Sequence, residues 1–239
     1  MAFFVVKNTV LISLIPIRNP IFAGMDKSEM ISKIEFEVKS LFDGEGTGHD
    51  WYHIDRVRRI ALKISRVENA DMFLVELGAL LHDIADHKFH GNDLSVGPSR
   101  SKELILKAGG DINLAQRVSE IVAEVSYKGA GIETGVTSLE AAVVQDADRL
   151  DALGAIGIAR AFAYGGSKSR EIYNPSKKPK LHDTFLAYAE DEGTTINHFY
   201  EKLLLLKDRM QTATAKRMAE KRHAYMQDFL ETFYFEWNH

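Results

Sequence analysis

The 239-residue sequence contains no cysteine, which excludes a disulfide framework, zinc fingers, iron–sulfur ligation and a cysteine nucleophile. It also lacks an excess of positive charge. Its 30 Lys and Arg against 34 Asp and Glu give a formal net charge of -4, so no overall basic field would attract a nucleic acid polymer or an anionic membrane. Any metal site must therefore be built from histidine and carboxylate side chains.

The sequence also lacks an uninterrupted run of about 20 apolar residues, the length that crosses a membrane as a helix. Its most apolar stretch, residues 1–24, is broken by Lys, Asn and Arg, and a basic residue follows FFVV where a secretory signal would have one before it. Asp26 is a good N-cap for a helix that begins just after Met25. We therefore expect residues 1–24, as a presequence or the product of an upstream start, to lie outside the fold. Residues 25–239 then form one domain of a cytoplasmic protein.

From residue 26 onward, apolar residues recur at steps of three and four, the spacing that places them on one face of a helix. No segment shows the alternation of a strand, and no internal repeat is present. We therefore predict a single all-α domain. The expected helices cover about residues 26–41, 50–68, 71–86, 99–107, 112–126, 138–166, 194–209 and 212–236. The polar stretch that follows the sixth of these helices, up to residue 180, is expected to be an exposed basic loop.

His82 and Asp83 follow the segment MFLVELGALL, whose density of Leu, Val and Ala indicates a helix that is buried nearly all round. A buried charge without a partner costs several kcal/mol, so ionisable residues in such a place pair, form hydrogen bonds or bind a metal. The alternative is that the dipeptide is a helix end that meets solvent.

His53 lies on the preceding predicted helix, and Asp148 interrupts the apolar helix predicted over 138–166. Taken alone, each could be a structural residue with a local hydrogen bond. Together with His82 and Asp83, they offer two imidazoles and two carboxylates from three helices. Such a set suits a divalent ion such as Mn, Fe, Ni, Co, Zn or Mg.

The order His53, His82-Asp83, Asp148 resembles the H…HD…D signature of the HD-domain metal-dependent phosphohydrolases. The segments HDWYHIDRVRRIA, LGALLHDIADHKF and LEAAVVQDADRLDALGAIGIARAFAYGG are similar to those of small bacterial HD hydrolases, some of which cleave nucleoside triphosphates to the monophosphate and pyrophosphate. The resemblance covers about residues 26–239. It implies an all-helical fold in which these four residues bind the metal.

The segment QDADRLD contains three aspartates, and the family's last ligand stands in an A-D-R-L-like context that matches Asp148. At 100° per residue, Asp146 and Asp151 point about 200° and 300° away from Asp148 around a helix, so the three cannot face one ion equally. Asp151 can instead accept a hydrogen bond from a metal ligand.

The resemblance also implies attack on phosphorus by a water that the metal activates. Related enzymes often have an acidic residue three positions after the motif Asp, which here is Asp86, our candidate acid or base; a local helix cap is the alternative. The candidate phosphate-binding cations are, in order of preference, Arg56, one turn after His53, then Lys88 and Lys128. The alternative for each is a solvated surface residue.

Two other kinds of site are consistent with some of these residues. His49 and His53 with an acid between them resemble the H-E-x-x-H of zinc proteases, a hypothesis in which His49 is essential and Asp148 is not. A nucleotide sensor could retain the pocket without turnover. His87 and His90 could bind a second metal or line the entrance.

The sequence thus predicts a metal-dependent phosphohydrolase that acts on a small phosphorylated metabolite, above all a nucleotide, with phosphomonoesterase action on a nucleoside monophosphate as an alternative. The last predicted helix carries an aromatic stripe that would form either core packing or a homodimer surface. Its residues are Tyr225, Phe229, Phe233, Phe235 and Trp237.

Overall fold

The computed structural model describes residues 26–42, 44, 48, 50–84, 95–125, 135–181 and 193–239, so the predicted extension over residues 1–24 lies outside the described part. Within the described ranges all regular structure is helical, which confirms the predicted fold class. The helices are α1 (Lys27–Leu41), α2 (Trp51–Glu68), α3 (Met72–Leu81), α4 (Val96–Lys107), α5 (Ile112–Val125), α6 (Leu139–Asp151), α7 (Gly154–Ser167), α9 (Thr195–Glu201), the 3-10 helix η3 (Leu203–Arg209) and α10 (Ala213–Asn238).

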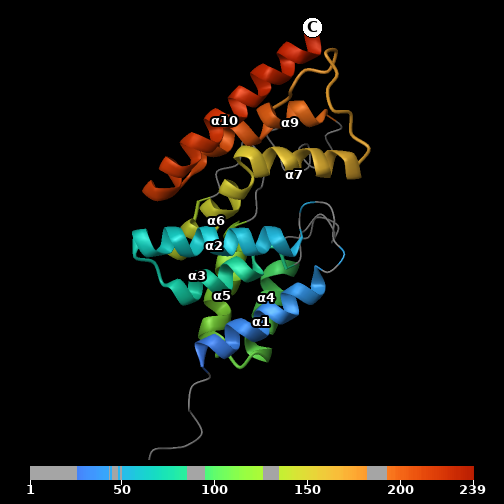
Figure 1. The fold of residues 1–239 in the computed structure, drawn as a ribbon. Coiled ribbons are helices and arrows are strands. Elements are labelled where there is room, and N and C mark those ends of the chain that lie inside the picture. The colour runs from blue at the N-terminus through green and yellow to red at the C-terminus, as the bar shows by residue number, and fades with distance from the viewer. Residues whose placement is uncertain are drawn as a thin grey trace, which may run out of the picture.

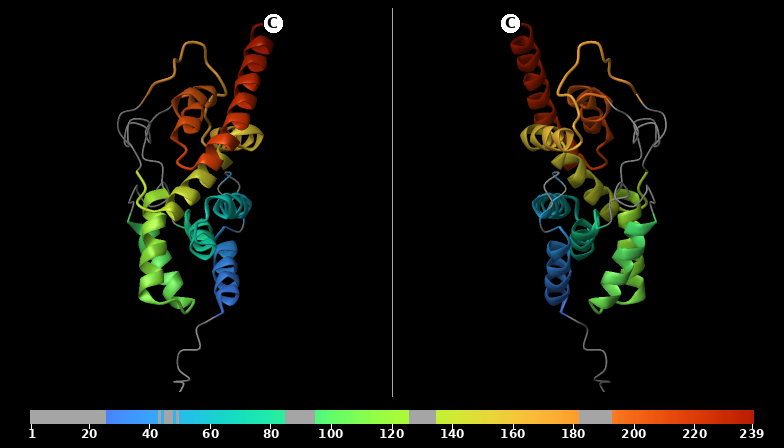
Figure 2. Two further views of the ribbon diagram at one scale, coloured as in Figure 1. Left: turned by 90° about the vertical axis from the view of Figure 1, so that its left-hand side faces the viewer. Right: turned by 90° about the vertical axis from the view of Figure 1, so that its right-hand side faces the viewer.

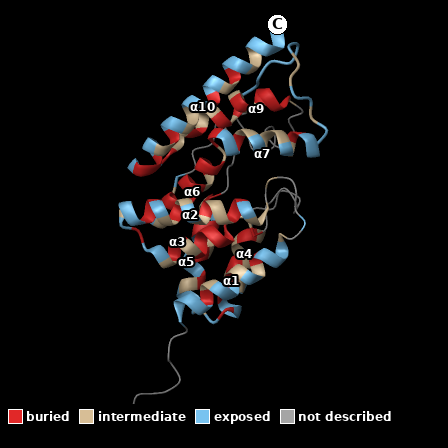
Figure 3. Ribbon diagram, viewed as in Figure 1, coloured by how far each residue is buried: buried red, intermediate tan, exposed pale blue. Residues whose placement is uncertain are grey.

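Helices α1 to α5 pack as a bundle in the lower half of Figure 1, and α6 packs against α2, α3 and α5 before it leads upward to the rest of the chain. We call α1 to α6 the α1–α6 bundle. Its buried hydrophobic side chains are mainly aliphatic. Figure 3 shows the buried residues in red, mostly where the helices of the bundle face one another. Fully buried examples are Ile34, Ile54, Leu77, Leu80 and Ile121. Burial of these side chains holds α2, α3 and α6 side by side.

Aspartates at the starts of α1, α2 and α3 cap these helices. The carboxylate of Asp26 accepts a hydrogen bond from the Ser28 amide, and that of Asp71 accepts hydrogen bonds from two amides in the first turn of α3. Asp50 caps α2 by accepting a hydrogen bond from the His53 amide at 2.8 Å. Because a cap fixes the first turn of its helix, Asp50 also fixes the position of His53.

The prediction of one long helix over residues 138–166 is wrong. The chain breaks at Ala152 and Leu153, so that α6 ends at Asp151 and α7 begins at Gly154. Gly154 has a φ of 74°, a left-handed conformation that favours glycine. Apolar spacing continues across the break, which is why the sequence pattern alone did not reveal it.

Two other predicted boundaries differ from the structure. Helix α3 ends at Leu81, with His82 as its C-cap, so it does not continue to residue 86 as predicted. The segment predicted as one helix over 194–209 is instead α9 followed by η3, with Lys202 between them in a non-helical conformation.

Helices α7, α9, η3 and α10, with the connecting residues 168–181, form what we call the C-terminal layer, seen in the upper half of Figure 1 and from two further sides in Figure 2. Aromatic rings pack among its buried aliphatic residues: Phe199 is fully buried and stacks on Phe229 with a centroid distance of 5.7 Å. The aromatic stripe of α10 is therefore divided. Its members Phe229 and Phe233 pack against the core, whereas Phe235 and Trp237 are about half exposed or more.

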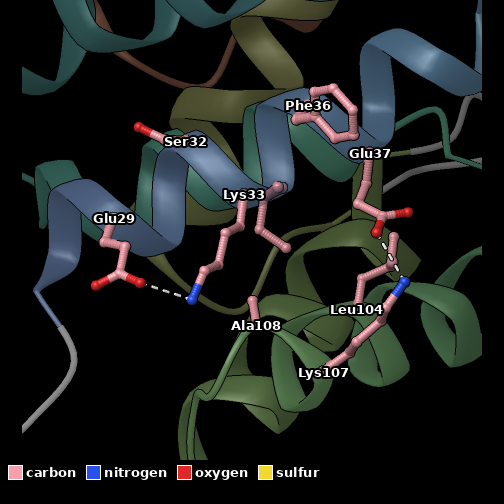
Figure 4. Close-up of a pocket in the computed structure, with 9 residues that line it drawn as sticks. Glu29, Ser32, Lys33, Phe36, Glu37, Leu104, Lys107 and Ala108 are labelled. Carbon is pink, nitrogen blue, oxygen red and sulfur yellow. Dashed lines mark hydrogen bonds and ion pairs between the residues drawn. The ribbon is translucent and has the colours of Figure 1, made fainter.

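A pocket of about 330 Å³ lies between α1 and α4 and is shown in Figure 4. Ion pairs Glu29–Lys33 and Glu37–Lys107 border its apolar floor. None of the residues that line it is a predicted site residue. Among the described residues, no helix combines the length and the apolar character that crossing a membrane requires.

Candidate metal centre

Three of the predicted ligands, His53, His82 and Asp148, converge in the structure, and one ligand atom from each lies within 4.8 Å of the others. The two histidine Nε2 atoms are 3.2 Å apart. Asp148 Oδ1 lies 3.5 Å from Nε2 of His53 and 3.8 Å from Nε2 of His82. Each side chain comes from a different place in the α1–α6 bundle: the first turn of α2, the C-cap of α3 and the last turn of α6.

The fourth predicted ligand, Asp83, lies beside this group. Its Oδ2 is 3.7 Å from Nε2 of His53. The two histidines are almost fully buried, but the Asp148 side chain is 31% exposed and that of Asp83 is 17% exposed. The site is therefore closed behind the imidazoles and open to solvent at its carboxylates.

Hydrogen bonds at Nδ1 indicate the tautomer of each histidine. Nδ1 of His82 lies 2.8 Å from the carbonyl oxygen of Ala79, and Nδ1 of His53 lies 2.8 Å from Oδ2 of Asp151. Both partners accept hydrogen bonds, so each Nδ1 carries the proton and each Nε2 keeps its lone pair. Burial lowers the pKa of His53, which favours the same neutral ring.

This donor set fits a divalent metal ion. Two Nε2 lone pairs only 3.2 Å apart, with carboxylate oxygens of Asp148 and Asp83 beside them, bring together acceptors that a cation can satisfy at once. With metal–ligand bonds of about 2.1 Å, neighbouring ligand atoms would lie about 3.0 to 3.4 Å apart. The observed spacings are close to that range, so little movement would be needed to bind an ion.

Asp151 lies behind His53, and its hydrogen bond to this candidate metal ligand agrees with the expectation from the sequence. Its carboxylate also accepts two hydrogen bonds from Arg56, at 2.8 and 3.0 Å, and one from Arg160 at 3.1 Å. Burial alone would raise the pKa of Asp151, but the hydrogen bonds from His53 and Arg56 hold it well below its usual range. Asp151 is therefore a carboxylate that fixes the His53 ring, an arrangement typical of metal-binding histidines.

Asp146 has no part in this cluster. Its fully buried carboxylate accepts hydrogen bonds from the backbone amides of Gln211 and Thr212 and from the Thr212 hydroxyl. It thus anchors the start of α10 to α6. The three aspartates of QDADRLD have three separate environments, as the helix geometry predicted.

Several predicted residues lie outside the described residues: Asp86, Lys88 and Lys128, together with His49, His87 and His90. Of the predicted phosphate-binding cations, only Arg56 is described. It forms the paired hydrogen bonds with Asp151, and about a quarter of its side chain remains exposed.

The sequence interpretation missed Arg160. Its side chain, on α7, donates from Nε to the carbonyl oxygen of Gly48 at 2.8 Å and from Nη1 to Asp151 at 3.1 Å. The available signal was a single charged residue within the apolar stretch GAIGIARAFAYGG. A straight helix would carry Arg160 away from Asp151. The predicted continuous helix therefore gave no indication that these two residues are in contact.

Comparison with known proteins relates these residues to a family. The HD domain family matches residues 50–153, a range that contains all four predicted ligands and Asp151. The protein YpgQ of Bacillus subtilis is 37% identical over 207 residues, which cover 86% of this chain and 93% of the relative.

Solved structures have the same fold. An HD-superfamily hydrolase from Bacillus thuringiensis is 41% identical, with a TM-score of 0.68 over 89% of this chain and 99% of that one. A Lactobacillus plantarum protein is 34% identical, with a TM-score of 0.78 over 90% of this chain and 99% of that one. The structure of B. subtilis YpgQ in complex with ADP has a TM-score of 0.68 and 34% identity, over 88% of this chain and 96% of that one.

Proposed function

Because the chain belongs to the HD-domain superfamily of metal-dependent phosphohydrolases, we propose that it hydrolyses a small phosphorylated metabolite, specifically a nucleotide. The specific reaction is hydrolysis of a nucleoside triphosphate. Water adds to the α-phosphorus, and the bond between that phosphorus and the oxygen that links it to the β-phosphorus breaks. The nucleoside monophosphate and pyrophosphate are released.

The observation that carries this proposal is the convergence of His53, His82 and Asp148 from three helices on one point. The nucleotide is supported by the similarity to YpgQ, which was solved in complex with ADP. The four-residue H…HD…D order is complete in this chain, which favours turnover over a sensing role.

A divalent ion at this site would lower the pKa of water to near neutrality and stabilise the charge that develops on the phosphoryl oxygens. The protein's own contribution is orientation. His53 and His82 direct their Nε2 lone pairs into the site, because Asp151 and the Ala79 carbonyl hold their Nδ1 protons. The exposed carboxylate side, at Asp148, is where the substrate enters.

The other predicted residues complete the proposed reaction. Asp86 is the candidate acid or base that transfers the proton of the attacking water. Arg56 donates to Asp151 through Nε and Nη2, so its other guanidinium N–H groups can meet a phosphate oxygen. Lys88 and Lys128 are candidates for the remaining phosphate charges.

Product analysis tests the proposal. The protein is reconstituted separately with Mn²⁺, Ni²⁺, Co²⁺ and Mg²⁺ and incubated with a nucleotide panel, and phosphate and pyrophosphate are scored separately. We expect pyrophosphate from a nucleoside triphosphate. The Asp148→Ala variant, purified in the same way, should release none, and this control excludes a contaminating hydrolase.

The other outcomes would each replace the specific reaction. Phosphate from a monophosphate would retain the hydrolase and change the substrate class to a phosphomonoester. Tight nucleotide binding without any product, with every metal, would contradict hydrolysis and favour a nucleotide sensor.

A further inference from the structure

We infer that Arg160 is a positioning residue of the metal centre, through which the C-terminal layer holds the His53 imidazole in place. The inference rests on the metal site of the proposed function. It assigns a role to a residue outside the residues 50–153 that match the HD domain family.

Arg160 contacts the carboxylate that supports His53. Arg160 is mostly buried, with 16% of its side chain exposed, and its Nη1 donates to Oδ2 of Asp151 at 3.1 Å. The same Oδ2 accepts the hydrogen bond from Nδ1 of His53 at 2.8 Å. One carboxylate oxygen therefore joins the arginine to the metal-binding ring.

The second contact of Arg160 lies on the approach to α2. Its Nε donates to the carbonyl oxygen of Gly48 at 2.8 Å. Gly48 has a φ of 89° and packs against Arg160, since a Cβ built there would lie 3.5 Å from Cγ of the arginine. Gly48 precedes Asp50, the cap that fixes the first turn of α2. Arg160 thus holds the His53 ring through Asp151 and the start of the His53 helix through Gly48.

The break between α6 and α7 makes these contacts geometrically feasible. Residues nine apart on a straight helix are separated by about 13 Å along its axis, too far for the direct hydrogen bond that joins Asp151 and Arg160. The left-handed Gly154 turns α7 back, so that Arg160 returns to the end of α6.

Only an arginine can make this pair of contacts. Nε and Nη1 are fixed in one plane and point to two different acceptors, whereas a lysine offers a single charged nitrogen. Substitution by Lys therefore keeps the charge and loses the two-point contact, and substitution by Gln loses both.

The two effects have opposite signs, which makes the test sharp. Removal of a positive charge near a metal site strengthens the binding of a cation, because a like charge has been taken away. Loss of positioning weakens binding, by about 10-fold for residues that orient a metal ligand. Weaker binding in Arg160→Gln can therefore come only from lost positioning.

The experiment measures metal affinity without substrate. Metal-free full-length protein is titrated calorimetrically with Mn²⁺, Co²⁺, Ni²⁺ and Zn²⁺, and the ion that the wild type binds most tightly is used for all variants. We expect Arg160→Lys to bind about 10-fold more weakly and Arg160→Gln to lie between Arg160→Lys and the wild type. Arg59→Gln is the matched control on α2: Arg59 is 67% exposed and pairs only at the surface with Asp55, so its affinity should not change.

A double variant tests the route through Asp151. If Arg160 acts through that carboxylate, Arg160→Lys combined with Asp151→Asn should bind metal no more weakly than Asp151→Asn alone. If the double variant instead binds metal more weakly by the product of the two single-variant fold-changes, Arg160 acts by another route and the inference is overturned. Helical circular dichroism and thermal midpoints of all variants exclude unfolding as the cause.

Other results also decide the question. Unchanged affinity in Arg160→Lys, or tighter binding in Arg160→Gln, would overturn the inference while the proposed function stands. A change in KM for the nucleotide with unchanged metal affinity would make Arg160 a substrate contact. A wild-type protein that binds none of the four ions would contradict the metal centre itself.

Discussion

The α1–α6 bundle and the C-terminal layer differ in the aromatic content of their cores. The hydrophobic side chains buried in the bundle are aliphatic apart from Met30, whereas in the layer Phe199 and the rings of α7 and α10 that pack on it join the buried aliphatic residues. The family match ends at residue 153, at the joint between the two regions. All the predicted metal ligands lie on the bundle side of this joint.

The layer nevertheless reaches back to the site. Arg160 binds Asp151, the Arg222 guanidinium donates to the Leu150 carbonyl, and the start of α10 binds Asp146. These contacts all meet the last two turns of α6, the helix that carries Asp148. The bundle therefore carries the candidate metal ligands, and the C-terminal layer contacts the end of the helix that bears Asp148.

The largest expected effect is at the bundle's own ligand. Asp148→Ala should abolish metal binding, because it removes the carboxylate that faces both Nε2 atoms. The helical circular-dichroism signal should remain, since the side chain is partly exposed. Calorimetric metal titration together with hydrolysis assays checks this. Hydrolysis at the wild-type rate would refute the site assignment.

The core of the C-terminal layer can be tested with two phenylalanines. Phe199→Ala should lower the free energy of unfolding by about 3–5 kcal/mol, because it empties a fully buried site. Phe235→Ala, at a ring that is 64% exposed, should change it by no more than about 0.5 kcal/mol. Urea unfolding followed by circular dichroism measures both. Equal effects would contradict the assignment of Phe199 as the centre of the layer.

The joint between the two regions offers a matched pair of glycines on α7. A Cβ at Gly157 would lie 2.2 Å from the Ala152 carbonyl oxygen, whereas one at Gly166 would meet nothing within 4 Å. Gly157→Ala should destabilise the protein by about 1–3 kcal/mol. It should also weaken metal binding, because moving α7 displaces Arg160.

Gly166→Ala is the control for that pair and should be neutral or stabilising by up to about 1 kcal/mol, because alanine favours a helix. Thermal or urea unfolding and metal titration of both variants would check the comparison. A stable Gly157→Ala protein with wild-type metal affinity would show that the joint between α6 and α7 does not affect the metal site.

The smallest effect is expected at the N-terminus. Deletion of residues 1–24 should cost neither folding nor activity, because α1 has its own cap in Asp26. Melting temperature and hydrolysis rate of the truncated protein test this. An insoluble or inactive product would instead make the segment part of the domain.

Local sequence was enough to predict the helical class and the N-cap Asp26, and it singled out His53, His82, Asp83 and Asp148 as candidate metal ligands. Helical spacing and capping depend on neighbours within one or two turns, so they are visible in a single sequence. The resemblance supplied the order of the ligands, and helix geometry separated Asp148 from Asp146 and Asp151.

Only the tertiary structure decided how α6 and α7 are joined and that Arg160 reaches Asp151, the carboxylate behind His53. Apolar spacing is the same on both sides of Gly154, and a glycine there is compatible with a continuous helix or with a left-handed turn. In the observed turn, Gly154 lies against Arg222 and Gly157 lies against the Ala152 carbonyl. The hydrogen bonds of Arg160 follow from that choice, because they join residues up to 112 positions apart, a separation that no local pattern records.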